Sequence, residues 1–238
     1  MFGRIVFESG VLKHVSGKQH PFEMRTLGGS DMPQMSKLRD DVTAGISEWD
    51  MFLPTPDSVI KKGLENEGIT CGTLVNDRLV GLRSFHFPIA GDPENIGTYA
   101  YISKDELGKV VDLKLSLVRE DYRRNNLQKR MTAHLMGLIG DMGRNHLCAI
   151  VSPKNVASMR DKFTLGMCIK RMMLKEKSFW RCLFHLDRSL PLLTPIADVY
   201  INNRDFEGQR DLIEYGYWGF EMVKGENNTG QIRYAIFN

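Results

Sequence analysis

The amino-acid sequence predicts an α/β fold in which a mixed, mostly antiparallel and twisted sheet carries helices on both faces. Residues 111–117 alternate apolar and polar side chains, which is typical of a strand with two unlike faces. Residues 127–142 place apolar side chains three and four positions apart, which is typical of a helix packed on another element. Strand-like runs precede and follow this pair. We therefore expect one main core, followed by a small C-terminal appendage that packs on it.

Composition narrows the class of protein. The chain has 238 residues, enough for one substantial core, and a net charge of +3 with basic and acidic residues interspersed, which argues against a nucleic-acid binder. Four cysteines, at positions 71, 148, 168 and 182, lie in apolar runs, which favours reduced, buried thiols over a disulfide or metal framework. The histidines show no ligand spacing, so no metal is expected. With no evident signal peptide or membrane-spanning run, we expect a cytoplasmic protein.

The N-terminal third predicts a hairpin, two helices and a second hairpin. Residues 5–7 and 11–15 flank Ser9-Gly10 as a possible hairpin turn, residues 16–21 read as a linker, and residues 22–27 form a strand. One helix starts at Ser30 and buries Met35, Leu38 and Val42; another starts near residues 55–57 and stops by Gly68. Strands at 69–75 and 78–87 are joined by an Asn76-Asp77 turn, and a loop follows at 88–106.

The rest of the chain alternates further strands and helices. After the strand at 111–118 and the helix at 127–142, we expect a strand at 146–151, a helix from 156 to Gly166, and strands at 167–174 and 179–186. The appendage then contains a connector at 190–195, a helix capped by Asp205 and a hairpin of residues 218–223 and 231–237.

The turn between the strand at 111–118 and the helix at 127–142 is polar and cationic. It contains Arg123 and Arg124, and it lies where a helix leaves its first N–H groups unpaired. Unpaired N–H groups, the positive end of the helix dipole and two guanidinium groups together form an anion site. We expect this anion to be a pyrophosphate.

Two blocks of the sequence resemble the GNAT acyl-CoA N-acyltransferase family, bacterial type. VREDYRRNNLQ at residues 118–128 is similar to the acetyl-CoA motif, in which a valine-ended strand and Tyr-Arg precede a glycine-containing turn that opens a helix. Ser152-Pro153-Lys154-Asn155 through Ser158, Phe163 and Gly166 is similar to the later Asn block of that family. The resemblance spans residues 22–187 and implies a GNAT-like sheet with splayed central parallel strands. It gives three parts: an N-terminal hairpin and linker at 1–21, the acyltransferase domain at 22–187 and the appendage at 188–238.

The chain departs from the motif at its glycines. Arg124, Asn126 and Gln128 stand where the family has glycine, which lets backbone N–H groups approach phosphates closely. Asn tolerates a left-handed conformation better than most residues, so Asn126 is a partial substitute. The tyrosine that serves as general acid in the family falls near Lys162, and no tyrosine is there.

The resemblance implies an acetyl-CoA-dependent N-acetyltransferase, an enzyme in which an amine attacks the thioester directly in a ternary complex. Acetyl-CoA is then the co-substrate, and the backbone of the strand end pairs with its pantetheine amides. The implied cofactor-binding residues are Leu117, Val118, Arg123, Arg124, Asn125, Asn126, Leu127, Gln128, Asn155, Ser158 and Phe163. Asp112 is the candidate catalytic base, and Ser158, Tyr215 or Tyr217 could protonate the leaving thiolate.

Each assignment has a structural alternative. Asp112 could form a solvated surface pair with Lys114, the two arginines could belong to an ordinary solvated turn, and Asn155 could serve only as a helix cap. A second set of basic residues could touch the 3′-phosphate of CoA, although solvent-facing charges explain them better; these are Arg130, His134, Arg160 and Lys162.

Two rival functions remain. The lost glycines and tyrosine allow a non-catalytic CoA-binding or regulatory module, and the same arginines allow a nucleic-acid binder, which the modest net charge disfavours. The expected partner is a small-molecule or peptide amine, with neither nucleic acid nor membrane, and the resemblance allows a homodimer. The sequence does not identify the acceptor amine.

Overall fold

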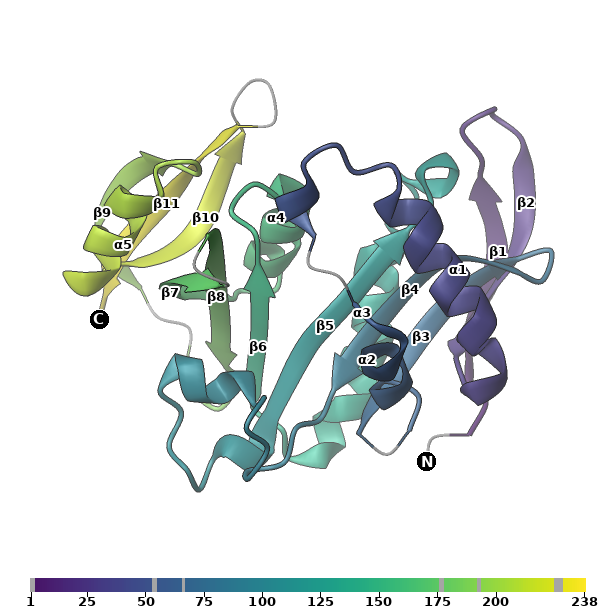
Figure 1. Cartoon of the computed structure of the whole chain (residues 1–238), viewed down its shortest axis with the longest axis horizontal. Coiled ribbons are helices and arrows are strands. Elements are labelled where there is room, and N and C mark those ends of the chain that lie inside the picture. Colours follow the sequence, from purple (N-terminus) through teal and green to yellow (C-terminus); the bar gives the residue numbers. More distant parts are fainter. Residues whose placement is uncertain (1–2, 53–54, 66, 176–177, 192–193, 225–228) are drawn as a thin grey trace. The chain divides into compact units, whose positions relative to one another are not determined.

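Strand β5, Val110–Val118, contributes to both parts of the molecule in the computed structural model (Figure 1). The structure describes residues 3–52, 55–65, 67–175, 178–191, 194–224 and 229–238. Unit 1 contains Met1–Phe87 and Leu113–Arg144, and unit 2 contains Pro88–Asp112 and Asn145–Asn238. This division does not test the domain boundaries expected at residues 22 and 187, which stay a prediction.

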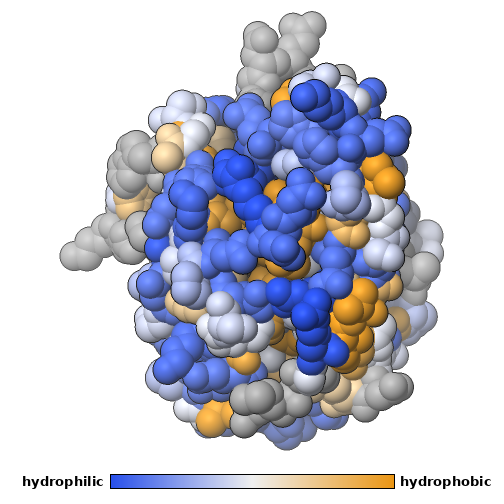
Figure 2. Space-filling model, turned by 90° about the vertical axis from the view of Figure 1, so that its right-hand side faces the viewer, coloured by the Kyte–Doolittle hydropathy of each residue, from blue (hydrophilic) through white to orange (hydrophobic). Residues whose placement is uncertain are grey.

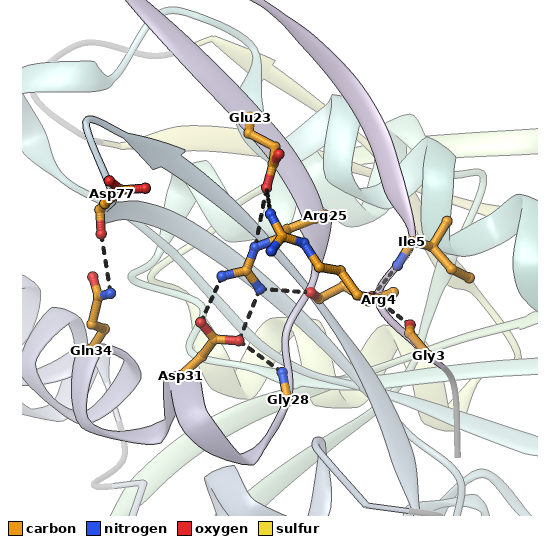
Figure 3. A network of polar contacts seen from close by, with 10 residues as sticks. Gly3, Arg4, Ile5, Glu23, Arg25, Gly28, Asp31, Gln34 and Asp77 are labelled. Carbon is orange, nitrogen blue, oxygen red and sulfur yellow. Dashed lines mark hydrogen bonds and ion pairs between the residues drawn. The ribbon is translucent and has the colours of Figure 1, made fainter.

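The strands of unit 1 form antiparallel pairs in chain order. These strands are β1 Val6–Lys13, β2 Gln19–Thr26, β3 Gly68–Val75 and β4 Arg78–His86, and they precede the second part of β5. The predicted Asn76-Asp77 turn is confirmed, because both residues have the positive φ, 47° and 60°, that a two-residue hairpin requires. Gln34 holds this turn by donating to the carbonyl of Asp77 at 3.1 Å (Figure 3) and accepting from the N–H of Leu79 at 2.8 Å.

The prediction of a hairpin turn at Ser9-Gly10 is wrong. Strand β1 runs through both residues, and Gly10 pairs with Phe22. A Cβ at Gly10 would lie 3.2 Å from the Phe22 ring, so the absence of a side chain here relieves the close approach of an aromatic ring. The hairpin turns instead between β1 and β2, where the N–H of His14 donates to the carbonyl of Lys18 at 2.8 Å. Most of the expected linker at 16–21 is therefore turn and strand.

Helices cover both faces of the sheet in unit 1. Helices α1, Met32–Thr43, and α2, Asp57–Lys62, pack on one core with Leu82 and Leu115, whereas Met131 of α3, Leu127–Ile139, reaches Gly81. Leu82 and Gly81 are neighbours on β4 and point to opposite faces. The expected helices are confirmed, although α1 begins after a short turn, η1 Gly29–Asp31, and α2 ends at Lys62.

An ion pair fixes the start of α1 against β2. Arg25 donates from both terminal nitrogens to the carboxylate of Asp31, at 2.8 and 2.9 Å (Figure 3). The N–H of Gly28 also donates to Asp31 at 2.9 Å, and Glu23 lies 3.2 Å from Nε of Arg25. The contacts from Arg25 and Gly28 hold the pKa of Asp31 below its usual value, chiefly because Arg25 hydrogen-bonds to the charged form.

Unit 2 contains the parallel strand pair. The first residues of β5 run parallel to β6, His146–Val151, with Val110 opposite His146 and Asp112 opposite Cys148. Strand β6 then pairs antiparallel with β8, Phe179–Asp187, and β8 pairs with β7, Cys168–Lys175. Helix α4, Val156–Thr164, connects β6 to β7. The predicted mixed and mostly antiparallel sheet is confirmed.

The C-terminal segment is part of unit 2. Helix α5, Phe206–Glu214, and the hairpin of β10, Trp218–Lys224, with β11, Gly230–Phe237, confirm the prediction; most of the expected turn between them lies outside the described residues. Strand β10 pairs with β7 through Gly219 and Ile169, so the segment packs on the rest of the unit. A strand was missed: β9, Pro195–Asn202, pairs with β11, and nearly all of its side chains are exposed.

The remaining short helical turns lie in connections. The loop at 88–106 contains η3, Ile96–Ala100, which packs with Val110 and Cys148. The other turns are η2 Trp49–Met51, η4 Leu107–Lys109, η5 Glu120–Tyr122 and η6 Gly140–Met142. All four cysteines are free thiols, and three are buried. On the face shown in Figure 2, hydrophilic residues predominate. None of the described helices is long and apolar enough to cross a membrane.

Candidate cofactor site

The loop that joins β5 to α3 has the backbone of a glycine-rich turn without its glycines. Strand β5 ends at Val118, and the N–H of Arg119 donates to the carbonyl of Val80 at 2.9 Å. Arg124 and Asn126 both lie in the left-handed region, with φ of 68° and 55°. Asn126, the partial substitute for glycine, thus adopts the conformation that asparagine tolerates, and Arg124 adopts it as well. Two of the three substituted glycine positions therefore retain the conformation that glycine favours.

The first turn of α3 offers uncapped N–H groups. Asn126 is the N-cap, and its side chain makes no capping hydrogen bond. Leu127 is 2% exposed and anchors the helix start, while Gln128 is half-buried within the first turn. A helix start of this kind presents N–H donors and the positive end of the helix dipole to an anion.

Two arginines flank these donors. Arg123 and Arg124 are both exposed. Arg123 lies 3.9 Å from Glu120, whose side chain is 88% exposed, so this ion pair is weak. Within the described part of the chain, no ion pair or hydrogen bond engages Arg124. Both guanidinium groups are thus accessible to a ligand.

The side chain of Asn125 supports the loop from within. Its Nδ2 donates to the carbonyls of Lys13 at 2.8 Å and Tyr122 at 3.0 Å, and its Oδ1 accepts from the N–H of Lys13 at 3.0 Å. Only the backbone of Asn125 remains for the binding role that the resemblance implied.

Other supports of the loop come from the turn between β1 and β2. The N–H of Val15 donates to the carbonyl of Asp121 at 2.9 Å, and Nδ1 of His20 lies 2.8 Å from the hydroxyl of Tyr122. Sequence reasoning missed these residues, because no local pattern links them to a loop about a hundred positions away.

Two of the basic residues considered for the 3′-phosphate are engaged elsewhere. Arg130 donates to Glu8 at 2.6 and 3.2 Å and lies over the ring of Phe22, and Nε2 of His134 is 3.3 Å from the same carboxylate. The hydrogen bond from Arg130 is the largest cause that lowers the pKa of Glu8. These two side chains are therefore part of a cluster that joins α3 to β1.

The candidate base, Asp112, is buried. Its exposed fraction is 7%, whereas Lys114 is exposed, so a solvated surface pair does not describe Asp112. It lies beside Cys148 on the parallel ladder. Burial raises the pKa of the Cys148 thiol, and the charge of Asp112 raises it further.

The end of β5 carries an unsatisfied hydroxyl. Leu117 is buried and Val118 is half-buried. Oγ of Ser116, one residue earlier, is buried and has no hydrogen-bond partner among the described residues. A polar group in this condition is uncommon in a folded protein, so the strand end retains hydrogen-bonding capacity.

The second block forms the start of α4. Oδ1 of Asn155 accepts from the N–H of Ser158 at 3.0 Å, so Asn155 is a helix cap, as one alternative held. Phe163 packs edge-on against Phe184 with ring centroids 5.1 Å apart. Lys162, at the position expected for tyrosine, is 2% exposed and pairs with Asp161 at 2.7 Å. Tyr215, another candidate acid, is 80% exposed.

No family model matches the sequence, and no curated protein matches it. Solved structures do match. Arabidopsis thaliana NAA60 in complex with acetyl-CoA has a TM-score of 0.56 at 12% identity, covering 71% of this chain and 99% of its own. The chain has the GNAT fold. The structure of yncA, a putative acetyltransferase from Salmonella typhimurium with its cofactor acetyl-CoA, has a TM-score of 0.53 at 14% identity, covering 74% of this chain and 98% of its own. The ribosomal-protein-S18-alanine N-acetyltransferase of Escherichia coli has a TM-score of 0.51 at 13% identity, covering 71% of this chain and 96% of its own. The matches cover at least 96% of each of these three solved structures.

Proposed function

We propose that the protein is an N-acetyltransferase that transfers an acetyl group from acetyl-CoA to an amine of a small molecule or peptide. The observation that carries the proposal is the loop before α3, with two left-handed residues, an uncapped helix start and two accessible arginines. The acetyl-CoA complexes of NAA60 and yncA support the same co-substrate for this fold.

In this proposal each part of acetyl-CoA has its own binding groups. The N–H groups from Arg124 to Gln128 bind the pyrophosphate, and Arg123 and Arg124 add charge-assisted contacts. The backbone of Leu117 and Val118 pairs with the pantetheine amides as an added strand would. The Asn155 side chain, whose oxygen caps α4, keeps its NH₂ group for a pantetheine carbonyl, and Ser158 and Phe163 line the arm.

The chemistry is attack by the neutral amine on the thioester carbonyl. Asp112 accepts the proton of the amine, directly or through a water molecule, and the nitrogen lone pair forms the new C–N bond. An N–H at the end of β5 stabilises the tetrahedral intermediate. The C–S bond then breaks, and the thiolate takes a proton from one of the candidate acids, Ser158, Tyr215 or Tyr217, as CoA leaves.

The first test measures CoA binding by isothermal titration. Arg123→Ala combined with Arg124→Ala should weaken binding by about 1.5–3 kcal/mol for each lost charged contact, because a hydrogen bond to an ionised group contributes this much. Lys104→Ala with Arg188→Ala removes the same charge from exposed positions elsewhere and should leave the affinity unchanged. Equal affinity in the loop variant would rule out the arginine assignment.

The second test measures thiol release from acetyl-CoA with polyamines, aminoglycosides, amino acids and peptide N-termini as acceptors. Asp112→Asn should lower turnover with an active acceptor by about 100-fold or more while the Kd for CoA stays unchanged. Binding without turnover across all acceptors would favour a CoA-binding regulatory module, which the buried lysine at position 162 makes the strongest rival. Steeply salt-dependent binding to unrelated oligonucleotides would instead favour nucleic acid.

A further inference from the structure

The C-terminal segment reaches the turn before α4 through one buried side chain. Asn203 is 0% exposed, and its Nδ2 donates to the carbonyl of Pro153 at 2.8 Å. Pro153 belongs to the Ser152–Asn155 turn that the sequence resemblance selected. A residue fifty positions away along the chain is therefore a direct support of this turn.

The amide of Asn203 has one orientation that satisfies its neighbours. Its Oδ1 accepts from the N–H of Gly230 at 2.9 Å, and its own N–H donates to the carbonyl of Gly230 at 2.9 Å. A rotated amide would place an oxygen against the Pro153 carbonyl and an NH₂ group against the Gly230 N–H. Because both contacts would then be repulsive, the side chain holds its donor on Pro153.

Two more buried side chains fix Asn203 in place. Nε2 of Gln209 donates to the carbonyls of Asn203 at 3.0 Å and Asn202 at 3.3 Å, and Oε1 of Gln209 accepts from the hydroxyl of Tyr234 at 3.1 Å. Gln209 and Tyr234 are both 0% exposed. Burial raises the pKa of Tyr234 well above its usual value, so the hydroxyl remains a neutral donor. A buried network with these contacts satisfied is rigid.

The Ser152–Asn155 turn links the position of Asn155 to this network. The N–H of Asn155 donates to the carbonyl of Ser152 at 2.9 Å, and the Asn155 side chain caps α4. Pro153 lies inside this turn, so the direction of its carbonyl is coupled to the placement of Asn155.

We propose that Asn203 is a positioning residue, which holds the Ser152–Asn155 turn so that the NH₂ group of Asn155 faces the pantetheine arm of CoA. This inference rests on the proposed function. It gives the C-terminal segment a definite role, because the segment lies outside the two resemblance blocks and yet maintains the second of them.

Asn203→Asp separates positioning from general stability. The carboxylate keeps an acceptor for Gly230 but places an oxygen against the Pro153 carbonyl. The Kd for CoA should rise about 5- to 10-fold, the effect of one lost hydrogen bond, while the Kd for ADP, which lacks the pantetheine arm, should change less than twofold. Asn203→Ser, which shortens the donor, should act in the same direction if the aspartate variant does not fold. Asp198→Asn, in an exposed pair with Arg233 of the same segment, is the control and should change neither Kd.

A double variant supplies the second readout. If Asn203 acts through Asn155, Asn203→Asp should have almost no further effect on CoA binding in an Asn155→Ala background. Parallel loss of CoA and ADP binding, an unchanged CoA affinity in the folded variant, or additivity with Asn155→Ala would each overturn the inference. Failure of the proposed function is distinct, because the wild-type chain itself would then not bind CoA.

Discussion

Arg124 holds a backbone conformation that an arginine seldom adopts. Its φ of 68° places Cβ close to a carbonyl oxygen, which costs about 1–2 kcal/mol relative to a right-handed conformation. Its neighbour Asn126 bears the same geometry at lower cost, because asparagine tolerates the left-handed region. Strain of this kind persists only where the surrounding structure enforces it, and here the Asn125 side chain enforces it through Lys13.

Arg124→Gly should therefore separate stability from binding. The free energy of unfolding should rise by about 0.5–1 kcal/mol, because glycine removes the left-handed penalty but adds freedom to the unfolded chain. CoA affinity should fall, because a charged contact is lost. Urea denaturation and calorimetric titration measure the two effects. Asn126→Gly is the comparison, with a smaller gain in stability and little loss of affinity. A less stable Arg124→Gly chain would contradict the strain assigned to this position.

Some residues of the site followed from sequence and others could not. The left-handed Asn126 fits the sequence argument, because asparagine stands where the family has glycine and tolerance of this conformation is a local property of the residue. The inward side chain of Asn125 was not, because its partner Lys13 is separated from it by 112 positions. The burial of Lys162 was also unexpected, since a charged side chain on a helix is usually solvated.

Helix α1 depends at its start on a side chain from a neighbouring strand. Asp31 accepts hydrogen bonds from both terminal nitrogens of Arg25 and from the N–H of Gly28. The side chains of Asp31 and Arg25 are only 11% and 13% exposed. The element was predictable from its apolar stripe, but the ion pair that fixes its first turn was not, because it joins two elements.

Asp31→Asn should cost about 2–3 kcal/mol at pH 7, because it removes the carboxylate charge that contacts both terminal nitrogens of a largely buried guanidinium, and Glu23 beside Nε replaces that charge only in part. The pKa of Asp31 is lowered in the folded state, so its contribution is complete above the unfolded value near 3.8 and is lost as the pH falls through the folded value. The difference in the free energy of unfolding between wild type and variant should thus become smaller below about pH 4. Urea denaturation at pH 7, 5 and 3 measures it. Glu65→Gln, in an exposed pair with Lys61, should cost little, and a gap independent of pH would contradict the assignment.

The helices and strands that the sequence predicted most accurately have one buried and one exposed face. Strand β5 and helix α3 bury one side and expose another, so their periods are visible. Strand β9 was missed because nearly all of its side chains are exposed, which leaves no alternation to detect. Ser9-Gly10 was misread because a glycine that accommodates an aromatic ring is indistinguishable, in sequence, from a glycine that makes a turn.

At the scale of the whole molecule, the C-terminal segment contributes buried side chains and a paired strand to unit 2. Ile232, Tyr234 and Ala235 of β11 are fully buried, and β10 pairs with β7 within unit 2. The sequence predicts an appendage too small for a core of its own, and that boundary stays a prediction; residues 145–238 belong to unit 2 together.

A chain that ends at residue 187 should therefore not unfold cooperatively. It would expose the side chains now covered by β10 and β11, and proteins have only about 5–15 kcal/mol of stability in reserve. Calorimetry and circular dichroism compare it with the full chain. A shortened chain with an unchanged melting temperature would show instead that the boundary expected at 187 separates two independent domains.

The Asn125 side chain both accepts from and donates to the backbone of Lys13, so the position of Lys13 affects the β5–α3 loop. Lengthening or shortening the bend at residues 14–18 would shift Lys13 relative to the β5–α3 loop, and so change the geometry of the proposed cofactor loop without touching any residue of the motif. Comparison of related chains by that motif alone would overlook this support, and an insertion near the amino terminus should be counted as a change in the proposed site.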